Sequence, residues 1–333
     1  MAVASRRLSD ATAPLSYDAA SEAFADIFSG RVDADEIARF LVTMTDRDES
    51  ADEIAAAAQA MRDRMIPVAA PANAIDVCGT GGDGSHSLNI STAVAIVVAA
   101  AGVPVAKHGN RAASSKAGAA DTLEALGLDL DRASARAEAS LDGIGIAFLF
   151  AQKHHPALGP IAPIRRAIGR RTIFNLLGPL ANPAGVRRQL IGVARVDYLP
   201  TVAAALTRLG AEAAMLVSGD ESLDELSIAG GSRAVRLGAI GSGDERVTPD
   251  LAGLPHHGLD AIRGGDPAFN AAALRELLNG AAGAYRDAVL LNAAGALIVA
   301  GRAADWRDGA AQAAAVIDDG AARDLLDRWI AFT

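Results

Sequence analysis

The stretch GTGGDG at residues 79–84 places four glycines within six positions. Glycine adopts backbone conformations closed to other residues, so such a loop can wrap closely around a ligand. Backbone N–H groups at a helix start attract anions, phosphate above all. Asn89, Ser91 and Thr92 follow at an expected helix start. The stretch therefore predicts a phosphate-binding loop, with a long turn between a strand and a helix as the alternative.

The same stretch contains the spacing G-x-G-x-x-G, which is typical of dinucleotide-binding loops. Such a loop opens directly into a helix, and an acidic residue about 20 positions later binds the ribose. Here the polar segment SHSLNIS intervenes, and no Asp or Glu occurs between Asp83 and Asp121. No lysine follows the last glycine, as it would in a Walker A loop. Both nucleotide patterns are therefore rejected.

A second polar stretch, residues 107–127, follows the next expected strand. It offers the charges of Lys107 and Arg111, the amide of Asn110 and two serine hydroxyls. A single lysine or arginine would ordinarily be a solvated surface residue. Since ligands of parallel α/β sheets bind at the carboxyl ends of the strands, two polar loops after consecutive strands should face one crevice. Together they predict a site for a polyanion.

Acidic residues concentrate in SGDESLDELS, residues 218–227. Taken alone, this segment would be a solvated acidic loop. Beside two phosphate-compatible loops it indicates a cation site, because Mg²⁺ bridges carboxylates and substrate phosphates. The six histidines form no zinc pattern, and the single cysteine, Cys78, excludes an intramolecular disulfide.

The composition defines the broad class of protein. Of the 333 residues, 51% are hydrophobic and 21% are charged, which is typical of a globular chain. The formal net charge of −9 argues against nucleic acid as the main partner. The longest apolar run, residues 93–106, is too short to cross a bilayer, and the N-terminus lacks the apolar run of a secretory signal. We expect a cytoplasmic protein with no membrane partner.

The expected elements fall into two parts. Residues 1 to about 68 show only helical patterns, and Ser50 with Glu53 forms a capping box before the third helix. After a connector at 67–74, strands alternate with helices, and from Asp266 onward the chain is expected to be largely helical. The expected strands are 74–78, 103–109, 145–150, 189–195 and 213–219. This order predicts an α/β fold: a small all-helical N-terminal domain and a large domain with a mainly parallel central sheet.

These motifs resemble the anthranilate phosphoribosyltransferase family over nearly the whole chain. The resemblance is carried, in family order and at family-like spacing, by GTGGDG…NIST, KHGNR…SS, FLFAQKHHPA, IRRAIGRRTIFNLLGPLANPA and DELS. The chain departs from the family at Ser218, where histidine is common, and at Ser222, where glycine is common. Both positions lie beside the acidic pair at 224–225, so they bear on the local loop geometry rather than on the activity.

The resemblance implies a nucleoside phosphorylase/phosphoribosyltransferase-like fold. It implies a helical domain over residues 1–70, to which helices around 163–182 could be added, and an α/β catalytic domain over 71–333. The implied reaction transfers the 5-phosphoribosyl group from 5-phosphoribosyl 1-diphosphate (PRPP) to the amino group of anthranilate, releasing diphosphate, in tryptophan biosynthesis. The implied protein is a Mg²⁺-dependent homodimer.

The resemblance also implies the site residues. For PRPP they are Gly79, Thr80, Gly82, Asp83, Ser87, Asn89, Ile90, Ser91, Thr92, Lys107, His108, Gly109, Asn110, Arg111, Ala112, Ala113, Ser114, Ser115 and Ala119. For anthranilate they are Gly79, Asn110 and Arg165, with His108, His155 and Pro179 as pocket walls. The implied metal ligands are Ser91, Asp224 and Glu225. No catalytic base is assigned, because the attacking aromatic amine is uncharged.

Several alternatives stay open at this point. Arg166, Arg170 and Arg171 neighbour Arg165, and only the match to the family motif selects Arg165 among them. A pyrimidine nucleoside phosphorylase would share the plan of the fold and a related glycine loop, but should lack the acidic pair and the segment RRTIFNLLGPLANP. A noncatalytic relative that binds nucleic acid would need an extended basic surface, which the net charge disfavours.

Overall fold

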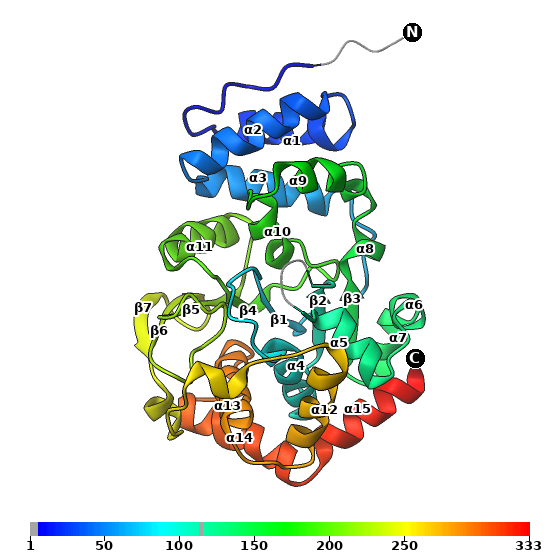
Figure 1. Cartoon of the computed structure of the whole chain (residues 1–333), viewed down its shortest axis with the longest axis vertical. Helices are drawn as coiled ribbons and strands as arrows, with labels where there is room; N and C mark the ends of the chain where they lie inside the picture. Colours follow the sequence, from blue (N-terminus) through cyan, green and yellow to red (C-terminus); the bar gives the residue numbers. More distant parts are fainter. Residues whose placement is uncertain (1–5, 113–115) are drawn as a thin grey trace.

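The computed structural model of the chain describes residues 6–112 and 116–333. Its first part is helical: α1 (Tyr17–Phe28), α2 (Ala34–Asp46) and α3 (Ala51–Arg62) pack together at one end of the molecule (Figure 1). The expected capping box opens α3, because Ser50 Oγ accepts from the Glu53 N–H and a Glu53 carboxylate oxygen accepts from the Ser50 N–H. The predicted helical N-terminal part is confirmed.

A sheet of seven strands runs through the rest of the described chain, in the order β3-β2-β1-β4-β5-β6-β7. β1 to β5 are parallel, and β6 and β7 continue the sheet as antiparallel strands. The strand order reverses at β1, which lies between β2 and β4, and ligands of such sheets bind at the carboxyl ends of the strands there. The strands are β1 (Ile75–Gly79), β2 (Val105–Gly109), β3 (Ile146–Phe150), β4 (Arg188–Gly192), β5 (Ala213–Gly219), β6 (Ser232–Gly238) and β7 (Gly243–Val247).

Helices cover both faces of this sheet (Figure 1). One face packs its inward side chains against α4 (Ile90–Ala100), α13 (Ala284–Val299) and their neighbours, and the other packs against α10 (Phe174–Leu180), α11 (Leu199–Arg208) and the N-terminal helices. No helix in the described ranges is long and apolar enough to span a membrane. The remaining helices are α5 (Ala119–Leu126), α6 (Leu130–Ala135), α7 (Ala137–Gly143), α8 (Ala151–His154), α9 (Ala162–Ile168), α12 (Pro267–Leu278), α14 (Trp306–Asp318) and α15 (Ala321–Phe332).

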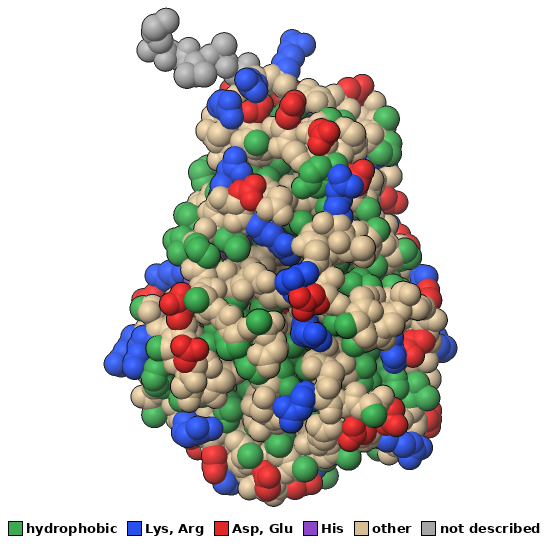
Figure 2. Space-filling model, turned by 180° about the vertical axis from the view of Figure 1, so that it is seen from behind, with side chains coloured by type: hydrophobic (Ala, Val, Ile, Leu, Met, Phe, Trp, Pro, Cys, Tyr) green, Lys and Arg blue, Asp and Glu red, His purple; other side chains and the backbone are tan. Residues whose placement is uncertain are grey.

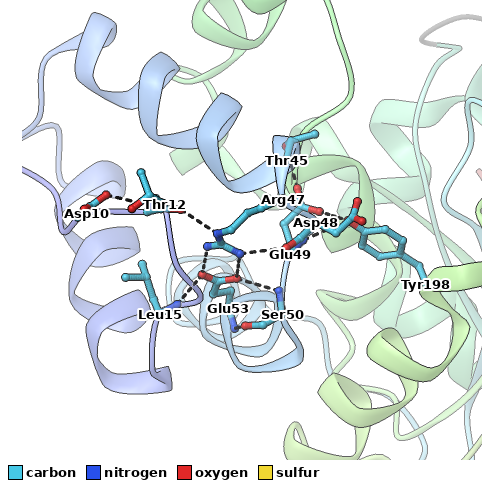
Figure 3. Close-up of polar contacts among 11 residues, drawn as sticks. Asp10, Thr12, Leu15, Thr45, Arg47, Asp48, Glu49, Ser50, Glu53 and Tyr198 are labelled. Atoms are coloured by element: carbon cyan, nitrogen blue, oxygen red, sulfur yellow. Dashed lines mark hydrogen bonds and ion pairs between the residues drawn. The ribbon is translucent and has the colours of Figure 1, made fainter.

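A buried polar network joins the α2–α3 turn to the short helix η2 (Val196–Tyr198), which follows β4 (Figure 3). The Tyr198 hydroxyl donates to the carboxylate of Glu49 and accepts from the Glu49 backbone N–H at 3.1 Å. Beside it, Arg47 binds the fully buried carboxylate of Glu53. The N-terminal helices are therefore attached to the sheet domain by directional contacts as well as by apolar packing.

The predicted α/β class and mainly parallel sheet are confirmed, and the five expected strands correspond to β1–β5. The β6–β7 hairpin was not predicted. Both of its strands carry charged side chains that pair across the ladder, Arg233 with Asp244 and Arg236 with Glu245. These ion pairs interrupt the apolar alternation by which a strand is recognised in a sequence.

Candidate active site

The glycine loop begins where β1 ends, at the point where the strand order reverses. The Thr80 N–H donates to Gly192 O at 2.9 Å, and Thr80 Oγ1 accepts from the Ala194 N–H at 3.2 Å, so the loop is anchored on β4 and its exit. Gly81, Gly82 and Gly84 have φ angles of 70°, 70° and 77°. Side chains other than hydrogen are strained in this left-handed region, which explains why the loop is glycine-rich.

Two further glycines let the acidic segment lie directly against the strand ends. A Cβ at Gly79 would lie 2.2 Å from Asp224 Oδ2, and one at Gly192 would lie 1.5 Å from Asp224 O. The Gly81 N–H donates to Asp224 Oδ2 at 2.6 Å. Residues far apart in the sequence, 79–84 and 223–225, are thus brought into direct contact.

Asp224 and Glu225 form a largely buried acidic pair. Burial raises the pKa of both carboxyl groups, and nearby carboxylates raise them further, Asp83 acting on Asp224 and Asp224 acting on Glu225. Such a pair is costly to ionise without a positive partner. Glu225 Oε1 accepts from the Ser91 N–H at 3.1 Å, which brings the start of α4 to the same place.

This donor set fits Mg²⁺. Mg²⁺ is commonly held by one or two carboxylates and completes its octahedron with water and substrate phosphates. Among the described residues, no group of three or more His, Cys, Asp or Glu side chains forms a ready-made metal cage. Asp224, Glu225 and the Ser91 hydroxyl could therefore hold the ion only together with other oxygen ligands, as a phosphate-bridging ion requires.

The start of α4 is fixed by residues that sequence reasoning missed. Asn89 Oδ1 accepts from the Thr122 hydroxyl and from Asn270 Nδ2, the latter at 2.9 Å, and Asn89 O accepts from the Tyr285 hydroxyl at 3.1 Å. Asn270 and Tyr285 lie nearly 200 positions from Asn89, and no local pattern links them.

The buried hydroxyl of Thr92, the third residue of α4, has no hydrogen-bond partner in the described structure. Ile90 begins the helix, and Ser87 pairs with Arg263 in an isolated bridge.

Lys107 and His108 reach the site from β2. The buried Lys107 ammonium donates to Val77 O at 2.6 Å and to Ser91 Oγ at 3.2 Å, beside the acidic pair. His108 Nε2 lies 3.2 Å from His155 Nε2, and His108 Nδ1 lies 2.8 Å from Gly178 O. Burial lowers the pKa of His108 to about 3 and that of His155 to about 4. Both rings are therefore neutral at physiological pH.

Arg111, in the loop after β2, contacts helix α5. Arg111 pairs with Asp121 and Glu124 of α5, and its guanidinium lies 5.6 Å from the Phe150 ring centre. Arg111 and Glu124 also line a surface hollow of about 420 Å³ that includes no residue of the glycine loop. Arg111 as a PRPP ligand therefore stays a prediction.

The other residues predicted around the end of β2 lie at the end of this strand, in the loop after it and at the start of α5. Asn110 Oδ1 accepts from the Arg111 N–H, and the Ala112 N–H donates to Asp121. Gly109 ends β2 and Ala119 begins α5. Ala113, Ser114 and Ser115 lie outside the described residues.

The four neighbouring arginines have different surroundings. Arg165, on α9, is half-buried, and its guanidinium lies over the Phe174 ring, 5.4 Å from the ring centre; this guanidinium forms no hydrogen bond or ion pair with the described residues. Arg166 is exposed, and Arg170 is exposed and pairs with Asp46 at 2.7 Å. Arg171 donates to two carbonyls of the glycine loop. Of the four, only Arg165 has a free guanidinium in a partly buried setting, which suits a carboxylate ligand.

The two departures from the expected family pattern have structural consequences. Ser222 has a φ of 62°, a left-handed conformation in which glycine is less strained than serine. Ser218 is buried at the end of β5, and its hydroxyl has no partner among the described residues. Both changes leave the contact between the Gly81 N–H and Asp224 in place.

The family model for the a/b domain of the glycosyl transferase family matches residues 71–323, and the model for its helical bundle domain matches residues 5–65. The helical N-terminal part, the mainly parallel sheet and the phosphate-compatible loops at its switch point thus define a glycosyl transferase of this two-part kind.

Individual relatives narrow the class. The anthranilate phosphoribosyltransferase of Novosphingobium aromaticivorans is 63% identical over 97% of this chain and 98% of its own length. A crystal structure of the enzyme of that name from Thermus thermophilus is 42% identical, covers 96% of both chains and has a TM-score of 0.90. The Saccharomyces cerevisiae enzyme in complex with PRPP and Mg is 28% identical, covers 96% of this chain and 93% of its own, and has a TM-score of 0.87. The chain belongs to the anthranilate phosphoribosyltransferase family.

Proposed function

We propose that this protein transfers the 5-phosphoribosyl group from PRPP to the amino group of anthranilate, as a step of L-tryptophan biosynthesis. The bond from the anomeric carbon to diphosphate breaks, a carbon–nitrogen bond forms, and the amine loses a proton. The 63% identity to an anthranilate phosphoribosyltransferase over almost the full length of the chain supports these substrates. The observation that carries the proposal is the convergence of the glycine loop, the acidic pair and Lys107 at the switch point of the sheet.

For PRPP, the proposed site comprises the glycine loop, the start of α4 and the loop after β2. The glycine N–H groups and the first turn of α4 are suited to the anionic diphosphate, and the unpartnered Thr92 hydroxyl is available to a ligand. We expect catalysis to rest on positioning and on charge stabilisation of the departing diphosphate rather than on a covalent nucleophile. No residue is assigned as a general base.

For anthranilate, the proposed clamp is Arg165. A guanidinium grips a carboxylate through two parallel hydrogen bonds, which also orient the attached ring. The half-buried, unpaired state of Arg165 supports this role, and Asn110 with the backbone at Gly79 is proposed to complete the site. The neutral rings of His108 and His155 and the buried Pro179 are proposed as pocket walls.

For the metal, Ser91, Asp224 and Glu225 are the proposed ligands of Mg²⁺. The ion, when bound, would neutralise charge on the diphosphate oxygens. The raised pKa values of the two carboxyl groups, caused first by burial, support a positive partner there. A titration of activity against Mg²⁺ for Asp224→Asn/Glu225→Gln should shift to higher concentration than for the unchanged protein, and an unshifted curve would remove the pair from the metal site.

At the level of the whole protein, we propose a helical domain over residues 1–70, with the helices around 163–182 added to it, and a catalytic domain over 71–333. Packing of the α9–α10 region against α1–α3, including Phe174 against Phe24 at 6.3 Å, supports this grouping. We propose that the protein is cytoplasmic and forms a homodimer, and the dimer is proposed from the family resemblance alone. Size-exclusion chromatography with light scattering tests the dimer.

The experiment that tests the function follows anthranilate fluorescence in a mixture of protein, PRPP and Mg²⁺. We expect a loss of signal that needs all three components and produces diphosphate in equal amount. A protein that leaves anthranilate unchanged, yet releases free base from thymidine or uridine with phosphate, would instead be a nucleoside phosphorylase.

Nucleic-acid binding is the weaker alternative. On the face shown in Figure 2, Lys and Arg side chains alternate with Asp and Glu rather than forming one broad basic surface. The formal net charge of −9 argues in the same direction. A gel-shift assay at low salt should give no retarded DNA band.

A further inference from the structure

Arg171 lies between α9 and α10, and although it neighbours Arg165 it is not among the residues implied for PRPP, anthranilate or the metal. Its Nη1 atom donates to Gly81 O and to Gly82 O, at 2.9 Å each. These two carbonyls belong to consecutive residues of the glycine loop, both with a φ of 70°. One guanidinium nitrogen therefore fixes two successive peptide units of the proposed diphosphate loop.

The remainder of the loop is held from the opposite direction. The Thr80 N–H binds Gly192 O of β4, and the Gly81 N–H binds Asp224 Oδ2. These contacts fix N–H groups, whereas Arg171 fixes carbonyl oxygens. Consecutive glycines rotate their peptide units at little cost, so the orientation of such a loop depends on its external partners. A carbonyl oxygen turned toward a bound diphosphate would repel it, because both carry negative charge.

The residues that follow Arg171 are held in place by their own contacts. The Thr172 N–H donates to Asn175 Oδ1 at 3.0 Å, and Ile173 and Phe174 are buried against the N-terminal helices. The same α9–α10 region carries Arg165, the proposed anthranilate clamp. The region proposed to bind anthranilate thus also contacts the loop proposed to bind PRPP.

We propose that Arg171 is a positioning residue for PRPP, which holds the Gly81 and Gly82 carbonyls away from the diphosphate and so keeps the glycine loop in its anion-binding conformation. This inference rests on the proposed function, and it concerns a residue that acts through the loop rather than on the reacting atoms. The matched comparison is Arg170, the preceding arginine, which is exposed and pairs with Asp46.

The test compares Arg171→Ala, Arg171→Met, Arg171→Lys and Arg170→Ala with the unchanged protein. Steady-state kinetics give both Michaelis constants and kcat, and calorimetry with PRPP and Mg²⁺ measures binding without anthranilate. We expect Arg171→Ala and Arg171→Met to raise KM for PRPP roughly tenfold or more, since two charge-assisted hydrogen bonds are lost. The KM for anthranilate should stay within about twofold, Arg171→Lys should recover part of the loss, and Arg170→Ala should match the unchanged protein.

The outcomes separate this inference from the proposed function. An unchanged protein that neither binds PRPP nor consumes anthranilate would overturn the proposed function, and with it the role of Arg171. An active unchanged protein whose Arg171→Met variant keeps its KM for PRPP would overturn the positioning role alone. The positioning role would also be overturned if both Michaelis constants rose equally, or if Arg170→Ala raised KM for PRPP as much as Arg171→Ala does. Either result would indicate a general disturbance of the α9–α10 region. If Arg171→Ala fails to fold, the longer methionine side chain, which keeps the packing of the stem, decides the question.

Discussion

At the level of single residues, the guanidinium of Arg165 is distinguished by what it lacks. It is half-buried over Phe174 and has no hydrogen bond or ion pair within the described residues. Burial lowers the pKa of Arg165, but the group stays charged at any physiological pH. A partly desolvated cation without a partner is favourable only if a ligand supplies the negative charge.

Arg165→Ala should therefore separate the two substrates. We expect KM for anthranilate to rise roughly tenfold to hundredfold, because a bidentate charged contact is lost, while KM for PRPP changes little. Steady-state kinetics with each substrate varied in turn measure both constants. Arg166→Ala, which removes an exposed arginine one position along α9, is the control and should behave like the unchanged protein. A parallel rise of both constants in Arg165→Ala would mean that this arginine has been misassigned.

The buried histidines His108 and His155 predict an acid-sensitive fold. Burial holds their pKa values at about 3 and about 4, whereas unfolded histidine has a pKa near 6.5. Below that pH the unfolded state binds protons that the folded state refuses, so stability falls as the pH falls. The full stability is present above about pH 6.5, and each ring lowers it by roughly 1.4 kcal/mol per pH unit below that value.

Urea unfolding at a series of pH values from about 7.5 down to about 4.5 measures this dependence. His155→Gln should flatten the curve, because one of the two rings is removed. His256→Gln is the contrasting control: a hydrogen bond to Asp250 raises the pKa of the exposed His256, so that its removal should not flatten the curve. A slope unaltered in His155→Gln would show that other groups cause the acid sensitivity.

At the level of elements, the sequence predicts those with a strong local signal. The five parallel strands, the α3 capping box and the glycine loop all have such signals, and the structure contains them. The β6–β7 hairpin was not predicted, because its charged side chains interrupt the alternation of apolar and polar residues that is typical of a strand. Contacts across the fold were also beyond prediction. Asn270 holds Asn89 from 181 positions away, and Arg171 reaches the glycine loop from about 90 positions away.

Gly192 tests the contact between β4 and the acidic segment. Its missing side chain leaves room for Asp224 O, which a Cβ would approach to 1.5 Å. Because the clash is with backbone, Gly192→Ala must displace residues 223–225, at a cost of about 1–3 kcal/mol or more. We expect a lower unfolding temperature and a Mg²⁺ titration shifted to higher concentration. Gly143→Ala, at the end of α7, adds a Cβ with no atom within 4 Å and should change neither, and a normal titration in Gly192→Ala would contradict the proposed site.

At the level of the whole molecule, the junction between the N-terminal helices and the sheet domain separates stability from ligand binding. Tyr198 and Glu49 are both buried, and the tyrosine hydroxyl is bonded to the glutamate side chain and backbone (Figure 3). None of these atoms belongs to the glycine loop or the acidic pair. Beside them, the exposed side chains of Arg195 and Asp48 form an ion pair, with 2.9 Å between nitrogen and oxygen.

Tyr198→Phe should therefore weaken the fold without altering substrate affinity. Loss of the hydroxyl leaves a buried carboxylate short of one donor, which costs about 1–3 kcal/mol of unfolding free energy. Arg195→Ala removes the exposed ion pairs of Arg195 with Asp48 and Asp197 and the contact of its guanidinium with the Tyr198 ring, and it should cost about 1 kcal/mol or less. Denaturant unfolding measures both costs, and KM for each substrate should stay within about twofold in both variants. If Tyr198→Phe instead raised KM for PRPP at unchanged stability, the junction would be part of the binding machinery, because η2 follows the same β4 exit whose Ala194 N–H holds Thr80.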